Sequence, residues 1–351
     1  MNIVVKEKQL SKTKAIIYAF LAALFYSINV PVSKRLMVQV GPTTMAALLY
    51  LGAGIGIAVL SVLAERGRRE SLDRRDLPYT LGMILLDIVA PIFLMLGIRY
   101  GSSANASLLG NFEIVVTTMI ALLVFKESVS WQLWWAIGLV TLSSVVLSFE
   151  GNNTFDFSYG SLFVLLATVC WGLENNCTRK ISSKDTYEII MLKGIFSGLG
   201  AMGVATLQQE IIPEIQFIIA GLILGFVSYG LSIFLYVKAQ SVIGAAKTSA
   251  YYAVAPFFGA FLSFVFLKER MTESYLVALL LMIAGTAMVI ADTLKYRHEH
   301  GHQHAFRHFH DGYWHEHIIN HSHSHNHYIA QIKHGHYHAL MELERNHFPH
   351  I

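Results

Sequence analysis

The chain has 351 residues, of which 54% are hydrophobic and only 14% are charged, and its formal net charge is +3. This composition, with a mean hydropathy of +0.49, excludes an ordinary soluble domain, in which about a quarter of the residues are charged. The charges lie in groups between apolar runs, and all 17 histidines lie between His298 and His350. The sequence therefore predicts a membrane-embedded body followed by a polar tail.

Ten apolar runs have the length of a membrane-spanning helix, about 20 mainly apolar residues. They show no period-two alternation, which excludes the strands of a membrane barrel. The first run is too long for a signal peptide and no small-residue cleavage site follows it, so we expect it to remain as a helix. In chain order the runs are 15–32, 43–63, 77–97, 104–125, 131–149, 159–177, 188–207, 215–237, 246–267 and 273–292.

The distribution of Lys and Arg predicts the orientation. With a cytoplasmic N-terminus, the inner loops receive the basic residues of 6–14, 66–75 and 179–184, whereas the outer loops 150–160 and 208–214 contain no Lys or Arg. Basic residues are enriched on the cytoplasmic side of membrane proteins. We therefore expect a multi-pass protein of the inner (plasma) membrane, with both termini in the cytoplasm because the number of spans is even.

An internal repeat divides the body. The segment IALLVFKES, 120–128, resembles LSFVFLKER, 262–270, so that Lys126-Glu127 matches Lys268-Glu269. Segment 93–107 likewise parallels 234–249, and 25–34 resembles 170–179. Each copy holds five runs, and an odd number forces the second copy to enter the membrane from the opposite side. The sequence thus predicts two inverted repeats with a substrate site near the midplane between them.

These features define the expected fold class and domains. We expect an all-α integral membrane protein with ten transmembrane helices in two inverted five-helix repeats, plus a disordered His-rich tail. The expected parts are a cytoplasmic N-terminus (1–14), a first repeat (15–149), an external linker (150–158), a second repeat (159–292) and a cytoplasmic tail (293–351).

Two five-helix inverted repeats, each closing its fourth span with a Lys-Glu pair, resemble the EamA-type transporters of the drug/metabolite transporter superfamily. Three stretches are similar to a branch in which some members carry a His-rich C-terminal tail: CWGLENNCTRK at 170–180, Lys193-Gly194, and Asn111-Phe112-Glu113 with Thr117. The resemblance covers about residues 15–292. It implies transport of small organic molecules, often outward, but it does not name the substrate.

Four ionisable residues lie inside the predicted spans, Asp87, Glu113, Glu174 and Lys193. Each costs roughly 2.5–3.5 kcal/mol to insert, which indicates a partner or a polar site. Glu113 could take up a proton and couple it to transport, or it could pair statically with Lys193 or with neighbouring helices. Lys193 could snorkel to the cytoplasmic interface, or serve as a counter-ion for Glu113 or for an anionic substrate. The role of Asp87 is open.

Trp171, Glu174, Asn175 and Thr178 share one helical face by their spacing, and Asn29 stands at a matching place in the first repeat. Such a face could line a cavity for a polar or amphipathic molecule, or it could join helices by hydrogen bonds. The side chains of Tyr229, Tyr251 and Tyr252 could line the same space, although aromatic residues often serve packing alone. The predicted substrate-binding residues are Asn29, Asn111, Glu113, Trp171, Glu174, Asn175, Lys193, Tyr251 and Tyr252.

Histidines recur at every second position of the tail, so that three or four could converge on Zn²⁺, Ni²⁺ or Cu²⁺. We expect a flexible metal binder that is disordered without metal, or alternatively a pH-responsive tail that gains charge below about pH 6.5. The predicted metal ligands are His298, His300, His302, His304, His321, His323, His325, His327, His334, His336 and His338.

Together these features favour a secondary transporter that exports a small organic metabolite by alternating access, with a metal-binding or metal-sensing tail. A transporter of the metal or a metal complex, and a membrane metal sensor or scaffold without transport activity, are the alternatives. The expected partners are the lipid bilayer, the small-molecule substrate and divalent metal ions, and homodimerisation is left open. We expect no enzyme activity, no cofactor required for transport and no nucleic-acid binding.

Overall fold

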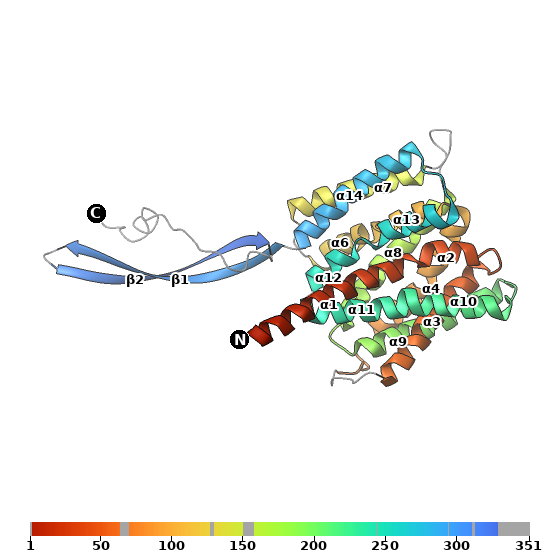
Figure 1. The fold of residues 1–351 in the computed structure, drawn as a ribbon, viewed down its shortest axis with the longest axis horizontal. Coiled ribbons are helices and arrows are strands. Elements are labelled where there is room, and N and C mark those ends of the chain that lie inside the picture. The colour runs from red at the N-terminus through yellow and green to blue at the C-terminus, as the bar shows by residue number, and fades with distance from the viewer. Residues whose placement is uncertain are drawn as a thin grey trace. The chain divides into compact units, whose positions relative to one another are not determined.

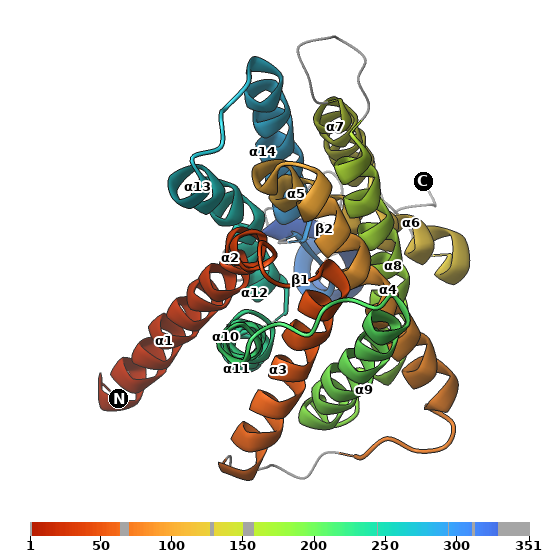
Figure 2. The same ribbon diagram turned by 90° about the vertical axis from the view of Figure 1, so that its right-hand side faces the viewer.

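The computed structural model describes residues 2–63, 70–126, 130–149, 158–243, 245–293, 295–310 and 313–328. Residues 1–292 and 293–351 form two separate compact units (Figure 1). The first unit is the body, which is built of helices, and the second is the tail. The helices of the body run largely side by side in Figure 1, and Figure 2 views α10 and α11 nearly end-on.

Within the described residues, the first repeat contains seven helices, and the second contains seven helices and one π-helical segment. In the first repeat they are α1 (Asn2–Ser27), α2 (Asn29–Leu36), α3 (Pro42–Leu63), α4 (Leu77–Tyr100), α5 (Ser103–Leu109), α6 (Phe112–Phe125) and α7 (Trp131–Ser148). In the second they are α8 (Tyr159–Ile181), α9 (Thr186–Leu207), α10 (Ile215–Gly225), the π-helix η1 (Phe226–Leu231), α11 (Ser232–Ile243), α12 (Ala245–Tyr252), α13 (Ala255–Leu267) and α14 (Glu273–Thr293).

Nine stretches of helix in the described part of the chain are long and apolar enough to cross a membrane. The predicted all-helical, multi-pass membrane body is therefore confirmed. The remaining candidate, α8, is a helix of 23 residues, but Glu174, Asn175, Asn176, Arg179 and Lys180 make its C-terminal half polar. Glu174 and Asn176 are buried, whereas Arg179 and Lys180 are exposed. Because α8 is not among the nine apolar stretches, a count of ten spans stays a prediction.

The packing of the helices repeats with the two halves exchanged. α4 packs along α8 and α11 packs along α1, while α6 contacts α8 and α13 contacts α1. α3 and α9, the second long helices of the two repeats, pack against each other, as Figure 2 shows. By position in the repeats, α1 corresponds to α8, α4 to α11 and α6 to α13. Exchanging the two repeats therefore turns the contacts of α8 with α4 and α6 into the contacts of α1 with α11 and α13. This reciprocity is what a two-fold relation between the repeats requires.

The matching Lys-Glu motifs end their helices in the same way. α6 ends at Phe125 and is followed by Lys126 with φ 53°, and α13 ends at Leu267 and is followed by Lys268 with φ 55°. This left-handed conformation commonly closes a helix, although glycine usually adopts it. The shared conformation supports the sequence alignment of the two repeats. Glu127 lies outside the described residues.

Glycines allow α3 and α9 to approach closely. A Cβ added to Gly194 would lie 2.5 Å from the Cα of Gly54, and one added to Gly54 would lie 2.6 Å from the nitrogen of Ile195. These distances leave no room for a side chain on either residue. Small residues that bring backbones together are typical of membrane helix interfaces.

The tail contains a two-stranded antiparallel ribbon of β1 (Lys295–His310) and β2 (Tyr313–Tyr328). This corrects the prediction of a disordered tail for these residues. The physical reason is that a histidine at every second position also has the two-residue period of a β-strand. The predicted ligands His334, His336 and His338 lie outside the described residues.

Candidate functional site

Interruptions divide several of the long helices of the body. A break follows Ser27 between α1 and α2, another follows Leu109 between α5 and α6, and a third follows Tyr252 between α12 and α13. The π-helix η1 lies between α10 and α11. Interrupted helices often mark the substrate site of secondary transporters, and π-helical turns are frequent at functional sites. Asn29, Asn111 and Tyr252 lie at or beside these interruptions, whereas Asp87, Glu174 and Lys193 lie on the uninterrupted helices α4, α8 and α9.

The first group of side chains, which we call the phenol cluster, surrounds the break between α1 and α2. Asn29 is buried and its Nδ2 donates a hydrogen bond to the hydroxyl of Tyr229, at 3.1 Å. The ring of Tyr229 contacts the ring of Tyr26 at 5.8 Å and that of Tyr50 at 5.4 Å between centroids, and Tyr26 contacts Tyr252 at 5.7 Å. Two repeats therefore build one cluster of an amide and four phenols.

The second group, the charge cluster, joins α4, α8 and α9. The Nζ of Lys193 lies 3.0 Å from Asp87 and 2.9 Å from Glu174. Asp87 is fully buried and the Glu174 side chain is 3% exposed, so one ammonium group balances two carboxylates away from water. Thr178 donates a hydrogen bond to Glu174. Lys193 therefore forms its ion pairs with Asp87 and Glu174, and no ion pair with Glu113 is present among the described residues.

Tyr50 connects the two clusters. Its hydroxyl donates a hydrogen bond to Asp87 at 2.9 Å and accepts one from the Nε1 of Trp171 at 3.3 Å, while its ring contacts Tyr229. Trp171 therefore contributes to the site through Tyr50. A single hydrogen-bonded network extends from Tyr50 to Lys193, and ring contacts join it to the phenol cluster.

Glu113 has a different environment from the other two acids. Its carboxylate accepts a hydrogen bond from the Nδ2 of Asn175 at 2.6 Å, and the same amide lies 3.4 Å from the hydroxyl of Thr117. Within the described residues no cationic group forms an ion pair with Glu113. Of the static alternatives for Glu113, the hydrogen bond from a neighbouring helix is present, and a pair with Lys193 is absent from the described residues.

Two more predicted residues lie near the interruptions. Asn111 lies in the break between α5 and α6 and is 4% exposed. Its Nδ2 has no hydrogen-bond partner among the described residues. Tyr251 contacts Phe20 at 5.2 Å between ring centroids, which places it in a different pair from Tyr252. Asn111 therefore holds a free donor, whereas the observed contact of Tyr251 is packing.

Four residues of the two clusters are absent from the predicted set of substrate-binding residues: Tyr26, Tyr50, Asp87 and Tyr229. Tyr50 links Trp171 to Asp87, and the signal that could have found it is that it is the one aromatic residue of the run 43–63. Asp87 stood out as an intramembrane acid, but its partner Lys193 lies on another helix. Tyr229 is central to the phenol cluster, because it accepts the hydrogen bond from Asn29 and its ring contacts those of Tyr26 and Tyr50.

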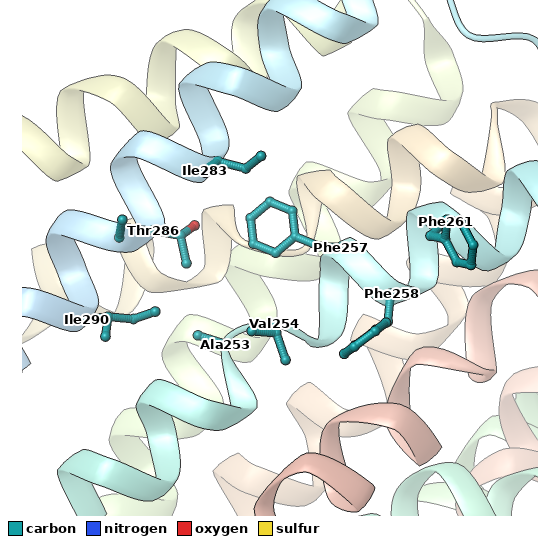
Figure 3. A pocket seen from close by; sticks show the side chains of 9 residues that line it. Ala253, Val254, Phe257, Phe258, Phe261, Ile283, Thr286 and Ile290 are labelled. Carbon is teal, nitrogen blue, oxygen red and sulfur yellow. The ribbon is translucent and has the colours of Figure 1, made fainter.

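A separate cavity of about 560 Å³ lies between α13 and α14. Figure 3 shows Phe257 and Phe258 on one side and Ile283 and Ile290 on the other, with the hydroxyl of Thr286 as a polar group in the lining. None of the predicted site residues lines it. A polar substrate needs several placed polar groups, so we place the candidate site at the two clusters rather than in this apolar cavity.

Two glutamates of the second repeat cap helices of the first. Glu210 accepts hydrogen bonds from the backbone nitrogens of Thr43 and Thr44 at 3.0 and 2.8 Å, at the start of α3. Glu269 accepts them from Ser103 and from Ala104, both at 2.8 Å, at the start of α5. A carboxylate is favourable at a helix N-terminus. These contacts join the two repeats at the ends of their helices.

Another contact joins the repeats through their connecting loops. Lys184 lies between 3.5 and 3.7 Å from each of the carboxylates of Glu70, Asp73 and Asp76. Although burial acts to lower it, the pKa of Lys184 is raised because these carboxylates favour the charged ammonium group. The pKa of Asp73 is lowered, mainly because its carboxylate accepts a hydrogen bond from the backbone of Arg75.

Comparison with known proteins gives relatives of the body. A protein of Methanothermobacter thermautotrophicus described as an uncharacterized transporter is 26% identical over 294 residues, which cover 75% of this chain and 82% of the relative. A crystal structure of another protein matches with a TM-score of 0.57 and 17% identity, covering 80% of this chain and 96% of that one. The second match concerns the fold alone.

The sequence pattern of the EamA-like transporter family matches twice, at residues 13–149 and 158–291. The two matches together cover most of the chain and coincide with the two halves whose helix contacts repeat. The expected resemblance to EamA-type transporters is thereby confirmed for the body, and the family implies a bilayer and a small-molecule substrate as partners. The chain belongs to the EamA-like transporter family, and it is a multi-pass membrane protein of a transporter type.

Proposed function

We propose that the chain is a secondary transporter that exports a small organic metabolite by alternating access. The observation that carries this proposal is the connected polar site, made of the phenol cluster and the charge cluster, that both repeats build. Asn29, Tyr50 and Asp87 come from the first repeat, and Tyr229, Trp171 and Lys193 come from the second. In transporters made of repeats, substrates bind at such an interface near the membrane midplane.

The chemistry of the site suits a polar or amphipathic organic molecule. Phenols and an indole offer apolar faces with hydrogen-bonding edges, and the buried Nδ2 of Asn111 is a donor without a partner among the described residues. A few placed polar groups among aromatic surfaces are typical of small-molecule sites. We propose that Asn29, Asn111, Glu113, Trp171, Glu174, Asn175, Lys193 and Tyr252 act there, together with Tyr50 and Tyr229, and that Tyr251 supports them.

We propose that α8 completes ten spans, so that the repeats are inverted and both termini lie in the cytoplasm. The reciprocal contacts of α4 with α8 and of α11 with α1 support this arrangement. The segment 66–75 between α3 and α4 is rich in arginine. It supports a cytoplasmic loop, because basic residues are enriched on that side of membrane proteins. With this orientation the caps formed by Glu210 and Glu269 lie on the external side. Their release would open the external path.

Glu113 is the proposed coupling group. Its carboxylate has the amide of Asn175 as its hydrogen-bond donor and no ion pair among the described residues, so a proton could neutralise it without breaking a salt bridge. The acids of the charge cluster, by contrast, share Lys193. Proton uptake at Glu113 therefore changes the charge of the site at a smaller structural cost than uptake at Asp87 or Glu174.

We further propose that the tail binds Zn²⁺, Ni²⁺ or Cu²⁺ and senses or buffers the metal beside the transporter. Histidines recur at every second position of the tail, and imidazole is a ligand suited to these metals. The body supplies amides, phenols and carboxylates at its site, which are groups suited to an organic cargo. We therefore assign the metal to the tail and the organic substrate to the body.

Counterflow in proteoliposomes tests the proposed transport, after a thermal-shift screen of metabolites has selected ligands. The full-length protein and a chain ending at Lys295 should both exchange the selected ligand, because the site lies in the body. Glu113→Gln should still bind the ligand but lose the pH dependence of exchange. A normal rate and pH dependence in Glu113→Gln would remove it from coupling, and no exchange of any screened ligand by either chain would contradict transport.

A further inference from the structure

The strand pairing of the tail places histidines opposite one another. In the antiparallel register His298 pairs with His325, His300 with His323 and His302 with His321. These are three consecutive rungs on one face, because residues two apart in a strand lie on the same side. Six histidines thus form one block of the ribbon, which we call the histidine block.

The register also separates the two faces of the ribbon. The six histidines of β1 occupy even positions and the six of β2 occupy odd positions, and the pairing of His298 with His325 assigns these positions to the same face. The opposite face holds other pairs, such as Arg307 with Glu316 and Phe309 with Trp314. Every histidine of the paired strands therefore shares one face.

An isolated two-stranded ribbon has little stability of its own in water. Charges and amides occupy much of the face opposite the histidines, and no third strand is paired with the ribbon in the described part of the tail. Ligands that bridge the two strands would supply the missing stability, because binding to the paired form alone shifts the equilibrium toward it. Imidazoles on facing strands are suited to a divalent metal ion.

We infer that the histidine block holds Zn²⁺ by four histidines taken from two adjacent rungs, so that metal binding fixes the register of the ribbon. Directly opposite Cβ atoms are about 5 Å apart, and adjacent rungs on one face are about 7 Å apart. His300 and His323 form the middle rung, so either possible set of four includes both of them. This inference rests on the proposed metal-binding role of the tail.

The middle and outer rungs give a matched pair of variants that lose the same number of histidines. His300→Gln with His323→Gln leaves two outer rungs about 14 Å apart, which cannot share one ion. His298→Gln with His325→Gln leaves two adjacent rungs and a complete set of four. Metal-free full-length protein in detergent is titrated with Zn²⁺ against a chromogenic chelator of known affinity, and the body serves as an unchanged folding control through its own melting temperature.

The register predicts unequal losses. The tightest Zn²⁺ site should weaken roughly tenfold or more in the middle-rung variant and stay within about twofold of wild type in the outer-rung variant. Equal weakening of the two variants would overturn the paired register, because a disordered tail depends only on its number of histidines. No weakening in either variant would overturn the assignment of the tightest site to the histidine block, since His308 pairs with His315 elsewhere on the same face. Absence of Zn²⁺ binding by the wild-type chain would instead contradict the proposed metal-binding role itself.

Discussion

The two repeats of the body share a backbone plan but not their charges. In the first repeat α4 carries Asp87 and α6 begins near Glu113, whereas the matching places in the second repeat hold Phe226 and Pro256. The helix contacts and the left-handed ends of α6 and α13 do repeat. The repeated features therefore set the frame in which one half can move against the other, and the features that do not repeat give the site its chemistry.

The charge cluster shows where the difference matters. Asp87 of the first repeat meets Lys193 and, through it, Glu174 of the second. Since Asp87 lies in the first repeat and Lys193 and Glu174 lie in the second, the complete set forms only when the halves associate. Substitutions in the charge cluster should therefore weaken the association of the two repeats. Substitutions at the close helix contacts should instead disturb the packing of the helices.

The largest effect is expected for Lys193→Met, which leaves two buried carboxylates without their ammonium group. Breaking a buried pair in this way costs about 3–5 kcal/mol, so the melting temperature of the full-length protein in detergent should fall strongly. Asp87→Asn leaves Lys193 paired with Glu174 and should cost clearly less. If Asp87→Asn destabilises the protein as much as Lys193→Met, the shared ammonium group is not what stabilises the cluster.

The shared frame is tested by Gly194→Leu, which forces a side chain into the contact of α9 with Gly54 on α3. Overpacking of this kind costs about 1–3 kcal/mol or more, and the melting temperature should fall. Gly203→Leu is the matched control on the same helix, because no atom of another group lies within 4 Å of its added Cβ. Similar losses in the two variants would show that the close approach is unimportant.

A smaller effect is expected for the glutamate caps. Glu269→Gln should weaken the capping of α5 by about 0.5–2 kcal/mol and speed hydrogen exchange at the amides of Ser103 and Ala104. Glu210→Gln should do the same at Thr43 and Thr44 while leaving the α5 amides protected. Faster exchange at both helices in each single variant would show that the caps are coupled; no change in either would show that they carry no stability.

The smallest effect concerns pH at the loop between α3 and α4. Because the pKa of folded Asp73 lies below the ordinary value of 3.8, its contribution is complete above that value and is lost as the pH falls through the lower folded pKa. Hydrogen exchange at the Arg75 amide should therefore accelerate in strong acid. Asp73→Asn should show fast exchange at every pH, and a pH profile like that of the wild type would contradict the role of this carboxylate.

Much of the fold could be predicted because hydropathy records which segments lipid can surround. The runs around 43–63, 77–97 and 273–292 are apolar throughout, and the matching Lys-Glu motifs revealed the repeat. α8 is harder to assign, because its C-terminal half is polar, with Glu174 and Asn176 buried and Arg179 and Lys180 exposed. The paired strands of the tail were missed because a histidine at every second position fits an unstructured ligand chain and a strand alike.

The partners within the site were harder to predict. The polar residues themselves, such as Asn29 and Glu113, stand out against apolar neighbours. The pair of Asp87 with Lys193 joins helices that are far apart in the chain, and a single sequence does not record which faces meet. Tyr50 illustrates the same limit, because an aromatic residue in an apolar run reads as packing until its hydroxyl is seen to contact Asp87 and Trp171.

Alternating access to the phenol cluster can be tested without knowing the substrate. In a chain with Cys170→Ser and Cys177→Ser, Asn29→Cys is reconstituted in liposomes and exposed to a membrane-impermeant maleimide from either side. Ile211→Cys, in an exposed loop, is the control that should react from one side only. We expect Asn29→Cys to react slowly from both sides. Reaction from one side alone, or from neither, would contradict alternating access.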